Sequence, residues 1–174
     1  MKVNVMSGDI TQTSQVNAIV ALANSNRTFF TDIDKAIQRK CDNYYHSRLM
    51  IQMSKTNRQP YDGQVFIVKG RTANNFSFKD IIFIIDDLTL PMRTLVFNAL
   101  CAAQEAGYEK IAMPPMRTGD MLGIVEKTVL DVVLAMKQGL LYFKQKYPDS
   151  VLTVNIIVHS DTGLEKFIKD NIAT

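Results

Sequence analysis

Short apolar runs alternate along the chain with longer stretches of mixed polarity. Six of these runs are apolar on most residues, and we predict strands over residues 3–6, 18–22, 64–69, 80–85, 110–113 and 151–158. Strands that are apolar on nearly every residue are typical of a sheet covered by helices on both faces. The pattern therefore predicts a sheet in the interior of the molecule.

Four longer stretches place apolar residues at intervals of three and four, the spacing of an amphipathic helix. They cover about residues 32–50, 91–107 and 124–146, and a last stretch that begins at Thr162. Pro91 in the first turn and Gly107 after the last turn mark the ends of the second helix. Thr162 and Glu165 form a capping-box pattern at the start of the last helix.

The order of these elements predicts the fold class. Strands and helices alternate over most of the chain, which favours an α/β fold, a three-layer α/β/α sandwich around a mixed, mostly parallel six-stranded sheet. The 64–69 and 80–85 strands have no helix between them and should pair antiparallel. No shift in composition marks a linker, so residues 1–174 are expected to form a single domain.

Composition excludes several classes of protein. Hydrophobic residues make up 47% of the chain and charged residues 21%, a balance typical of globular proteins. No apolar run approaches the roughly 18 residues of a membrane-spanning helix, and the first apolar run is too short for a signal peptide. Cys41 and Cys101 are too few for a disulfide framework or an all-cysteine zinc site. We therefore expect a reduced, cytoplasmic setting, with no membrane contact, metal or cofactor.

The charge pattern bears on nucleic-acid binding. Twenty Lys and Arg against seventeen Asp and Glu give a net charge of +3. The charges are mixed and form no basic stripe, so an RNA-binding domain is the least favoured function.

Three polar segments follow predicted strands, where ligands of open α/β sheets commonly bind. They are Ser7-Gly8-Asp9-Ile10-Thr11, Ala23-Asn24-Ser25-Asn26-Arg27, and Met113-Pro114-Pro115-Met116-Arg117-Thr118-Gly119-Asp120-Met121-Leu122-Gly123. The first could be a simple Gly-Asp turn or could use Asp9 to accept a hydrogen bond from a base. The second could be rich in Asn only because Asn tolerates left-handed backbone. The third, at a strand-to-helix junction, is typical of a rigid anion-binding turn.

Two further candidates are polar groups at the ends of strands. Asp86 and Asp87 could serve a metal or acid–base site, but adjacent strand residues point to opposite faces, and a polar turn before Pro91 is the favoured interpretation. His159 ends the last strand, where it could contact a bound base at the rim or lie on the surface as an ordinary histidine.

Taken together, these segments resemble the macrodomain family of ADP-ribose-binding α/β/α modules. Gly8-Asp9-Ile10-Thr11 resembles the family's Gly-Asp-Ile-Thr, and the strand ending in Ala23-Asn24-Ser25 resembles its Asn-Ala-Ala-Asn-Ser. The segment around Arg117-Thr118-Gly119 resembles its second phosphate loop. The resemblance covers essentially the whole chain and implies a small-molecule ligand similar to ADP-ribose, or an ADP-ribosylated protein, as partner.

The resemblance also implies roles for individual residues. Asp9 would bind the adenine amine, and the backbone amide of Ile10 would contact the base. The loop that begins at Ala23 and Asn24 would wrap the diphosphate and distal ribose, together with a set in the later loop, Arg117, Thr118, Gly119, Asp120, Met121 and Gly123. The negative charge of Asp120 would need Arg117 or a cation to offset it.

Catalysis by hydrolytic members depends on a loop in which this chain differs. The family's run of glycines falls on residues 29–32, where Phe29 and Phe30 would form a lid over the ribose or a plug in place of the glycines. The family's catalytic aspartate falls on Asp34, which with Asn24 could orient the ribose and a water. Asp34 could equally be a first-turn acid that stabilises its helix dipole.

Two functions therefore remain open for such a ligand. The chain could hydrolyse an ADP-ribosyl ester or ADP-ribose 1″-phosphate through Asn24 and Asp34. It could instead be a non-catalytic reader or sequestering protein for a nucleotide signal, which the altered first loop favours.

Overall fold

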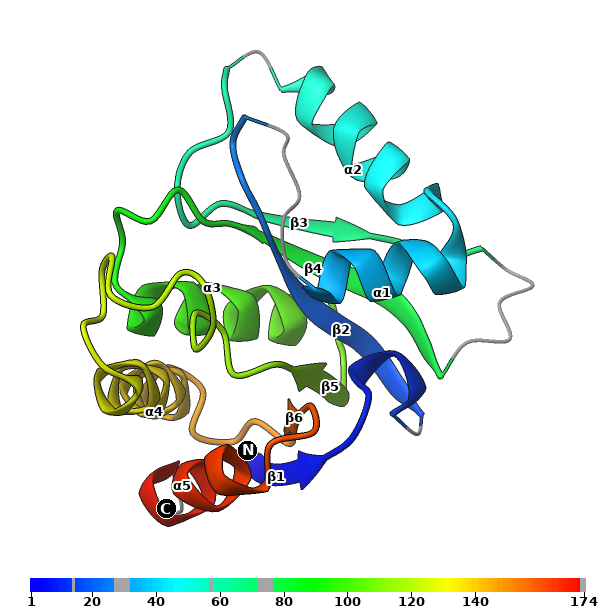
Figure 1. Cartoon of the computed structure of the whole chain (residues 1–174). Helices are drawn as coiled ribbons and strands as arrows, with labels where there is room; N and C mark the ends of the chain where they lie inside the picture. The colour runs from blue at the N-terminus through cyan, green and yellow to red at the C-terminus, as the bar shows by residue number, and fades with distance from the viewer. Residues whose placement is uncertain (14, 27–31, 57, 72–76, 173–174) are drawn as a thin grey trace.

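The computed structural model describes residues 1–13, 15–26, 32–56, 58–71 and 77–172, and its centre is a six-stranded sheet (Figure 1). The strands are β1 (Lys2–Ser7), β2 (Val16–Ala23), β3 (Val65–Val68), β4 (Phe78–Ile85), β5 (Lys110–Met113) and β6 (Thr153–Val158), in the order β1-β6-β5-β2-β4-β3. All neighbours are parallel except β3 and β4, whose antiparallel pairing confirms the prediction. The sheet is therefore mixed and mostly parallel.

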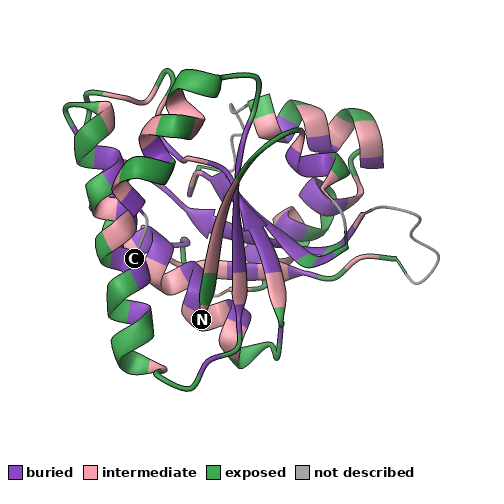
Figure 2. Cartoon of the chain, turned by 90° about the horizontal axis from the view of Figure 1, so that it is seen from below, coloured by how far each residue is buried: buried purple, intermediate pink, exposed green. Residues whose placement is uncertain are grey.

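Helices cover both faces of the sheet and complete the α/β/α sandwich. They are α1 (Asp32–Cys41), α2 (Tyr44–Lys55), α3 (Met92–Glu105), α4 (Val129–Lys146) and α5 (Thr162–Ile172). One apolar core forms between the sheet and α3, α4 and α5, and a second forms between the sheet and α1 and α2. Figure 2 shows the buried strands between the two helical layers. Within the described part of the chain, no helix is long and apolar enough to cross a membrane.

Local backbone chemistry moves two helix boundaries away from their predicted positions and changes the cap of a third helix, α5, which begins at Thr162 as predicted. The predicted 32–50 helix is two helices, because Asp42 has a left-handed φ of 52° and ends α1 before α2 begins. The helix predicted from residue 124 begins at Val129, since Thr128 and Asp131 form a capping box there. At α5 the cap comes from Asp161, whose Oδ1 accepts the amide of Leu164 at 2.8 Å, rather than from Thr162.

The parallel strands place their carboxyl ends along one edge of the sheet. Those ends lead into the segments after Ser7, Ala23, Ile85, Met113 and Val158. The short 3₁₀ turn η1 (Ile10–Gln12), the N-terminus of α1 and the loop before α4 come together at this edge. The three candidate segments of the sequence therefore begin at the same edge, as the parallel sheet requires.

Candidate functional site

Two adjoining cavities lie at the carboxyl edge of the sheet. The first cavity, of about 300 Å³, lies among η1, the end of β6, the start of α5 and one face of α1. The second cavity, of about 510 Å³, lies between the N-terminus of α1 and residues 114–121. The two share lining residues, namely Asp32, Ile33, Pro114, Pro115 and Thr118. They therefore form one continuous cleft, with dimensions suited to a nucleotide-sized ligand.

Asp9 lies at the wall of the first cavity and caps η1. Its Oδ1 accepts the backbone amide and the hydroxyl of Thr11, both at 2.8 Å, and its Oδ2 accepts the Gln12 amide nitrogen at 3.0 Å. Partial burial by itself raises the pKa of Asp9, but these hydrogen bonds and the charge of Lys40 outweigh it and leave the pKa below its ordinary value. Asp9 is thus a fixed, ionised acceptor at the cavity wall.

The rest of the first cavity is mostly apolar. Ile10 is buried beside Asp9, and Ile157, Pro114 and Leu164 contribute further apolar surface. His159 lies at the same cavity and is exposed, so both expected roles, a contact at the rim and an ordinary surface histidine, stay open. A flat, weakly polar ring system would fit such a wall.

The loop before α4 lines the second cavity with main chain and small side chains. Thr118, Gly119, Asp120 and Met121 all lie at this cavity. Within the described residues, no protein acceptor takes the backbone N–H groups of residues 116–121. Free amides in a turn are suited to bind an anion. Gly123, in contrast, is not among the lining residues and donates its amide to the Glu126 carbonyl at 2.8 Å.

Arg117 corrects an expectation from the sequence. Its guanidinium is turned inward and its side chain is only 1% exposed. It donates to both carboxylate oxygens of Asp86, at 2.9 and 2.5 Å, and to Glu126 at 2.8 Å. Glu126 in turn accepts the amide of Met92, the first residue of α3, at 2.7 Å. The Arg117 charge is therefore neutralised inside the protein and does not offset Asp120 or a bound phosphate.

The residues predicted to catalyse hydrolysis are not brought together in the cleft. Asp34 is 2% exposed and lies 3.1 Å from His46 Nε2, between α1 and α2. The Asn24 side-chain oxygen accepts the amide of Asn26 at 2.7 Å, and neither Asn24 nor the buried Ala23 lines either cavity. Phe29 and Phe30 lie outside the described residues.

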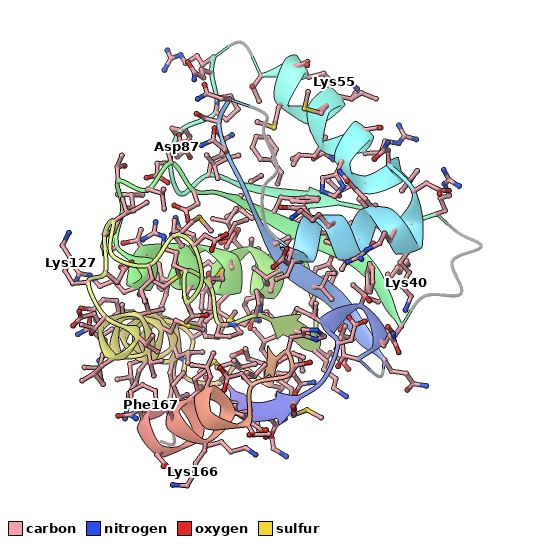
Figure 3. The ribbon with its side chains drawn as sticks, in the orientation of Figure 1. Lys40, Lys55, Asp87, Lys127, Lys166 and Phe167 are labelled. Atoms are coloured by element: carbon pink, nitrogen blue, oxygen red, sulfur yellow. The ribbon has the colours of Figure 1, made fainter. Side chains whose placement is uncertain are left out.

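The two carboxylates after β4 have structural partners. Asp86 binds Arg117, and Asp87 accepts the amide of Ser25 at 2.9 Å, beside the end of β2 (Figure 3). This agrees with the prediction of a polar turn. Within the described parts of the chain, no three acidic, histidine or cysteine side chains are grouped so as to hold a metal ion.

Sequence reasoning missed two residues that shape the cleft. Asp62 accepts the amides of Asp87, Thr89 and Leu90 and the Thr89 hydroxyl, and so fixes the loop that carries Leu88 to the second cavity. Arg39 lies on the face of α1 that lines the first cavity. The helical spacing of Asp32, Ala36 and Arg39 was the available signal, but only the fold shows which face of the helix meets a cavity.

Comparison with known proteins identifies the fold. The chain matches no protein-family model and no curated protein. Among solved structures, a point mutant of the Oceanobacillus iheyensis macrodomain with ADPR superimposes with a TM-score of 0.78 at 17% identity, over 97% of this chain and 90% of that one. The chain has the macrodomain fold.

Other structures with the macrodomain fold agree. The macro domain of ganglioside induced differentiation associated protein 2 gives a TM-score of 0.75 at 13% identity, over 98% of this chain and 84% of that one. The Trypanosoma brucei macrodomain in complex with ADP-ribose gives 0.73 at 16% identity, over 97% and 68%.

Proposed function

We propose that the protein binds ADP-ribose or a related adenine–ribose–phosphate ligand in the cleft at the carboxyl edge of its sheet. The observation that carries the proposal is the pairing of two features in one continuous cleft. Asp9 presents a fixed carboxylate in the first, apolar cavity, and free backbone amides border the second. Macrodomains solved with ADPR, ADP and ADP-ribose have the same fold, which supports this choice of ligand.

The adenine would occupy the first cavity. Each carboxylate oxygen can accept two hydrogen bonds. Asp9 Oδ1 already accepts two, while Oδ2 accepts one, from Gln12. The remaining position on Oδ2 requires a donor, which the exocyclic amine of adenine supplies and the carbonyl of hypoxanthine does not. Asp9 would therefore select an adenine base.

The diphosphate would occupy the second cavity. The amides of residues 116–121 would donate to its oxygens, because no protein group uses them among the described residues. Gly119 and Pro115 leave little side-chain bulk at this wall. This arrangement would hold the phosphates without an arginine, since the guanidinium of Arg117 is committed to Asp86 and Glu126.

Binding without hydrolysis is the activity that we infer. In the part of the chain that the structure describes, Asp34 is buried against His46 and lines neither cavity, which argues against its activating a water on the ligand. The protein would then act as a reader or sequestering protein for a free nucleotide or for the ADP-ribose of a modified protein. A cytoplasmic setting belongs to this proposal and is supported by two free cysteines. Nucleic acid is not part of it, given the mixed charges of the chain.

Calorimetric titration of ADP-ribose and of its inosine analogue tests the proposal. The wild type should bind ADP-ribose about 10–100-fold more tightly than the analogue, because a hydrogen bond to a charged group contributes about 1.5–3 kcal/mol. Asp9→Asn, which removes the charge and keeps an acceptor for Thr11, should lose most of this difference. Asp149→Asn is the matched control, since Asp149 is exposed and distant from both cavities.

Three outcomes would contradict parts of the proposal. No detectable binding of ADP-ribose by the wild type would mean that the cleft serves a different ligand. Equal binding of the two bases would remove the role of Asp9. In the same samples, release of ADP-ribose from ADP-ribosyl esters, or of phosphate from ADP-ribose 1″-phosphate, would overturn the non-catalytic assignment.

A further inference from the structure

The positive charge of the cleft lies in the cavity where the base would bind, not where the diphosphate would. In the second cavity, Lys35 pairs with Asp32 at 3.3 Å, and Arg117 is shared by two buried acids. Asp120 adds an exposed negative charge there. Among the described residues of this cavity, no cation is left without an acidic partner. The first cavity differs because Arg39 lies in its wall.

Arg39 has most of its hydrogen-bonding capacity available. Within the described part of the chain its guanidinium makes one hydrogen bond, from Nε to the carbonyl of Lys35 at 3.3 Å. Both terminal amino groups therefore remain available toward the cavity. Arginine stays charged at all accessible pH values, and its planar fork matches two oxygens of a phosphate.

Lys40 and His159 place further donors near the same corner. Lys40 extends from the end of α1 (Figure 3), and its Nζ donates to the Thr11 carbonyl at 2.6 Å, next to the turn that Asp9 caps. His159 lies across the cavity, at the end of β6. The acids of the first cavity are Asp9, whose carboxylate Thr11 and Gln12 already engage, and the exposed Asp32, which pairs with Lys35. Among the described residues, Arg39 and Lys40 donate to backbone carbonyls, and neither forms an ion pair with an acid of this cavity.

The order of the ligand's parts indicates what Arg39 would meet. With the base at Asp9 and the diphosphate at residues 116–121, the adenosine ribose must lie between them, along the face of α1. Ala36 and Arg39 both line the first cavity and only the first. Ala36 leaves space beside the ribose, and Arg39 lies one helical turn further toward the base corner.

We propose that Arg39 forms a phosphate subsite in the first cavity, and that the preferred ligand is an ADP-ribose-like nucleotide that carries an additional phosphate on its adenosine ribose. This inference rests on the proposed function, since it assumes the adenine at Asp9. The inference concerns which class of ligand the cleft prefers, and it uses the cleft already described. Arg39 is the specificity-determining residue, and Lys40 raises the local potential.

The test compares ADP-ribose with its 2′-phospho and 3′-phospho derivatives, all modified on the adenosine ribose. The wild type should bind at least one phosphorylated form about 10-fold or more tightly than ADP-ribose, in keeping with charge-assisted hydrogen bonds. Arg39→Gln should abolish this preference, because it should weaken the phosphorylated form by a larger factor than ADP-ribose. Arg39→Lys should retain part of it. Arg93→Gln, on exposed α3 surface, makes the same change in net charge away from the cleft.

Each outcome separates this inference from the proposed function. Equal affinity for all three ligands overturns the phosphate subsite and leaves ADP-ribose binding intact. A preference that survives Arg39→Gln overturns the assignment to Arg39. If Arg39→Gln weakens ADP-ribose and the phosphorylated forms by the same factor, Arg39 contacts the shared part of the ligand and the subsite is again wrong. If the wild type binds none of the three, both proposals fall.

Discussion

Two basic residues beside the second cavity differ sharply in environment. Arg117 is buried and bound to Asp86 and Glu126, whereas the Lys35 side chain is 66% exposed in its pair with Asp32. Burial of a charge is tolerated only when partners replace its water, and removing one partner leaves the others unpaired. An exposed pair is screened and contributes little. The charge of Arg117 is therefore needed for the stability of the fold, whereas the pair of Lys35 with Asp32 contributes little to the free energy of unfolding.

Replacing Arg117 should consequently destabilise the fold. Arg117→Met leaves two buried carboxylates without their cation, which costs about 3–5 kcal/mol in the free energy of unfolding. Lys35→Met should cost less than about 1 kcal/mol. Urea unfolding followed by far-UV circular dichroism measures both, since the chain contains no tryptophan. An Arg117→Met protein of wild-type stability that has lost its ligand would instead make Arg117 a phosphate ligand.

The partners of the predicted site residues could not be read from the sequence where they lie far along the chain. The loop of Arg117 lines the second cavity, and the signal that singled it out, Pro and Gly at a strand-to-helix junction, is local in the sequence. The acid that takes its charge, Asp86, lies 31 positions earlier in the chain. Likewise, the partner of the Asp34 side chain depends on α2 lying beside α1, which places His46 Nε2 3.1 Å from Asp34 Oδ1. Pairings of this kind need the tertiary structure.

Elements were predictable where burial fixes their composition. The six strands were found within a few residues; the signal is clearest for β2 and β4, which are buried at nearly every position and must be apolar along their length. Helix boundaries were less accurate, since one left-handed residue, Asp42, splits a continuous apolar stripe, and the Thr128 cap overrides the periodicity before it. The spacing of apolar residues indicates which face of a helix is buried, but it does not indicate where the helix begins or ends.

The contact between α3 and α4 leads to a prediction about stability. Gly139 of α4 is buried against α3, and a Cβ atom there would lie 2.6 Å from the Arg93 carbonyl oxygen and 2.8 Å from Val96 Cβ. Gly139→Ala should therefore lower the free energy of unfolding by about 1–2 kcal/mol, because overpacking costs more than the helix gains from alanine.

Gly163 offers the matched control in α5. A Cβ there would lie 3.4 Å from its nearest neighbour, an ordinary contact, so Gly163→Ala should leave stability unchanged or slightly higher. Thermal unfolding of the two variants beside the wild type distinguishes the sites. Equal stability of Gly139→Ala and wild type would show that α3 and α4 can separate at no cost.

The two ends of the sheet serve different purposes in the whole molecule. The carboxyl edge carries the cleft, whereas the opposite edge is closed by a polar cluster of Lys69, Asp80 and Tyr108, which join β3, β4 and the start of β5. Asp80 is buried and accepts hydrogen bonds from the Tyr108 hydroxyl, from Lys69 at 3.0 Å and from the Gly70 amide at 2.9 Å. This cluster has no access to the cleft, so changes in it should alter stability and leave ligand affinity unchanged.

The dependence of stability on alkaline pH tests the role of this cluster. Burial, and then the hydrogen bond to Asp80, raise the pKa of Tyr108 to about 12 from 10.0. Because the folded-state pKa is the higher one, the stabilisation is complete below pH 10 and is lost as pH rises from 10 to 12, by about 2–3 kcal/mol. Tyr108→Phe should be about 1–3 kcal/mol less stable than wild type at pH 8 and should lose that disadvantage by pH 12.

Urea unfolding at pH 8, 10 and 12 measures the two curves, with Tyr61→Phe as control because Tyr61 is exposed. Curves for wild type and Tyr108→Phe that stay parallel up to pH 12 would show that Tyr108 titrates normally and that its hydroxyl is not held by Asp80. Binding of ADP-ribose at pH 8 should be the same in both proteins, since the cluster and the cleft lie at opposite edges of the sheet. Weaker binding by Tyr108→Phe would mean that strain at one edge reaches the other through β4 and β5.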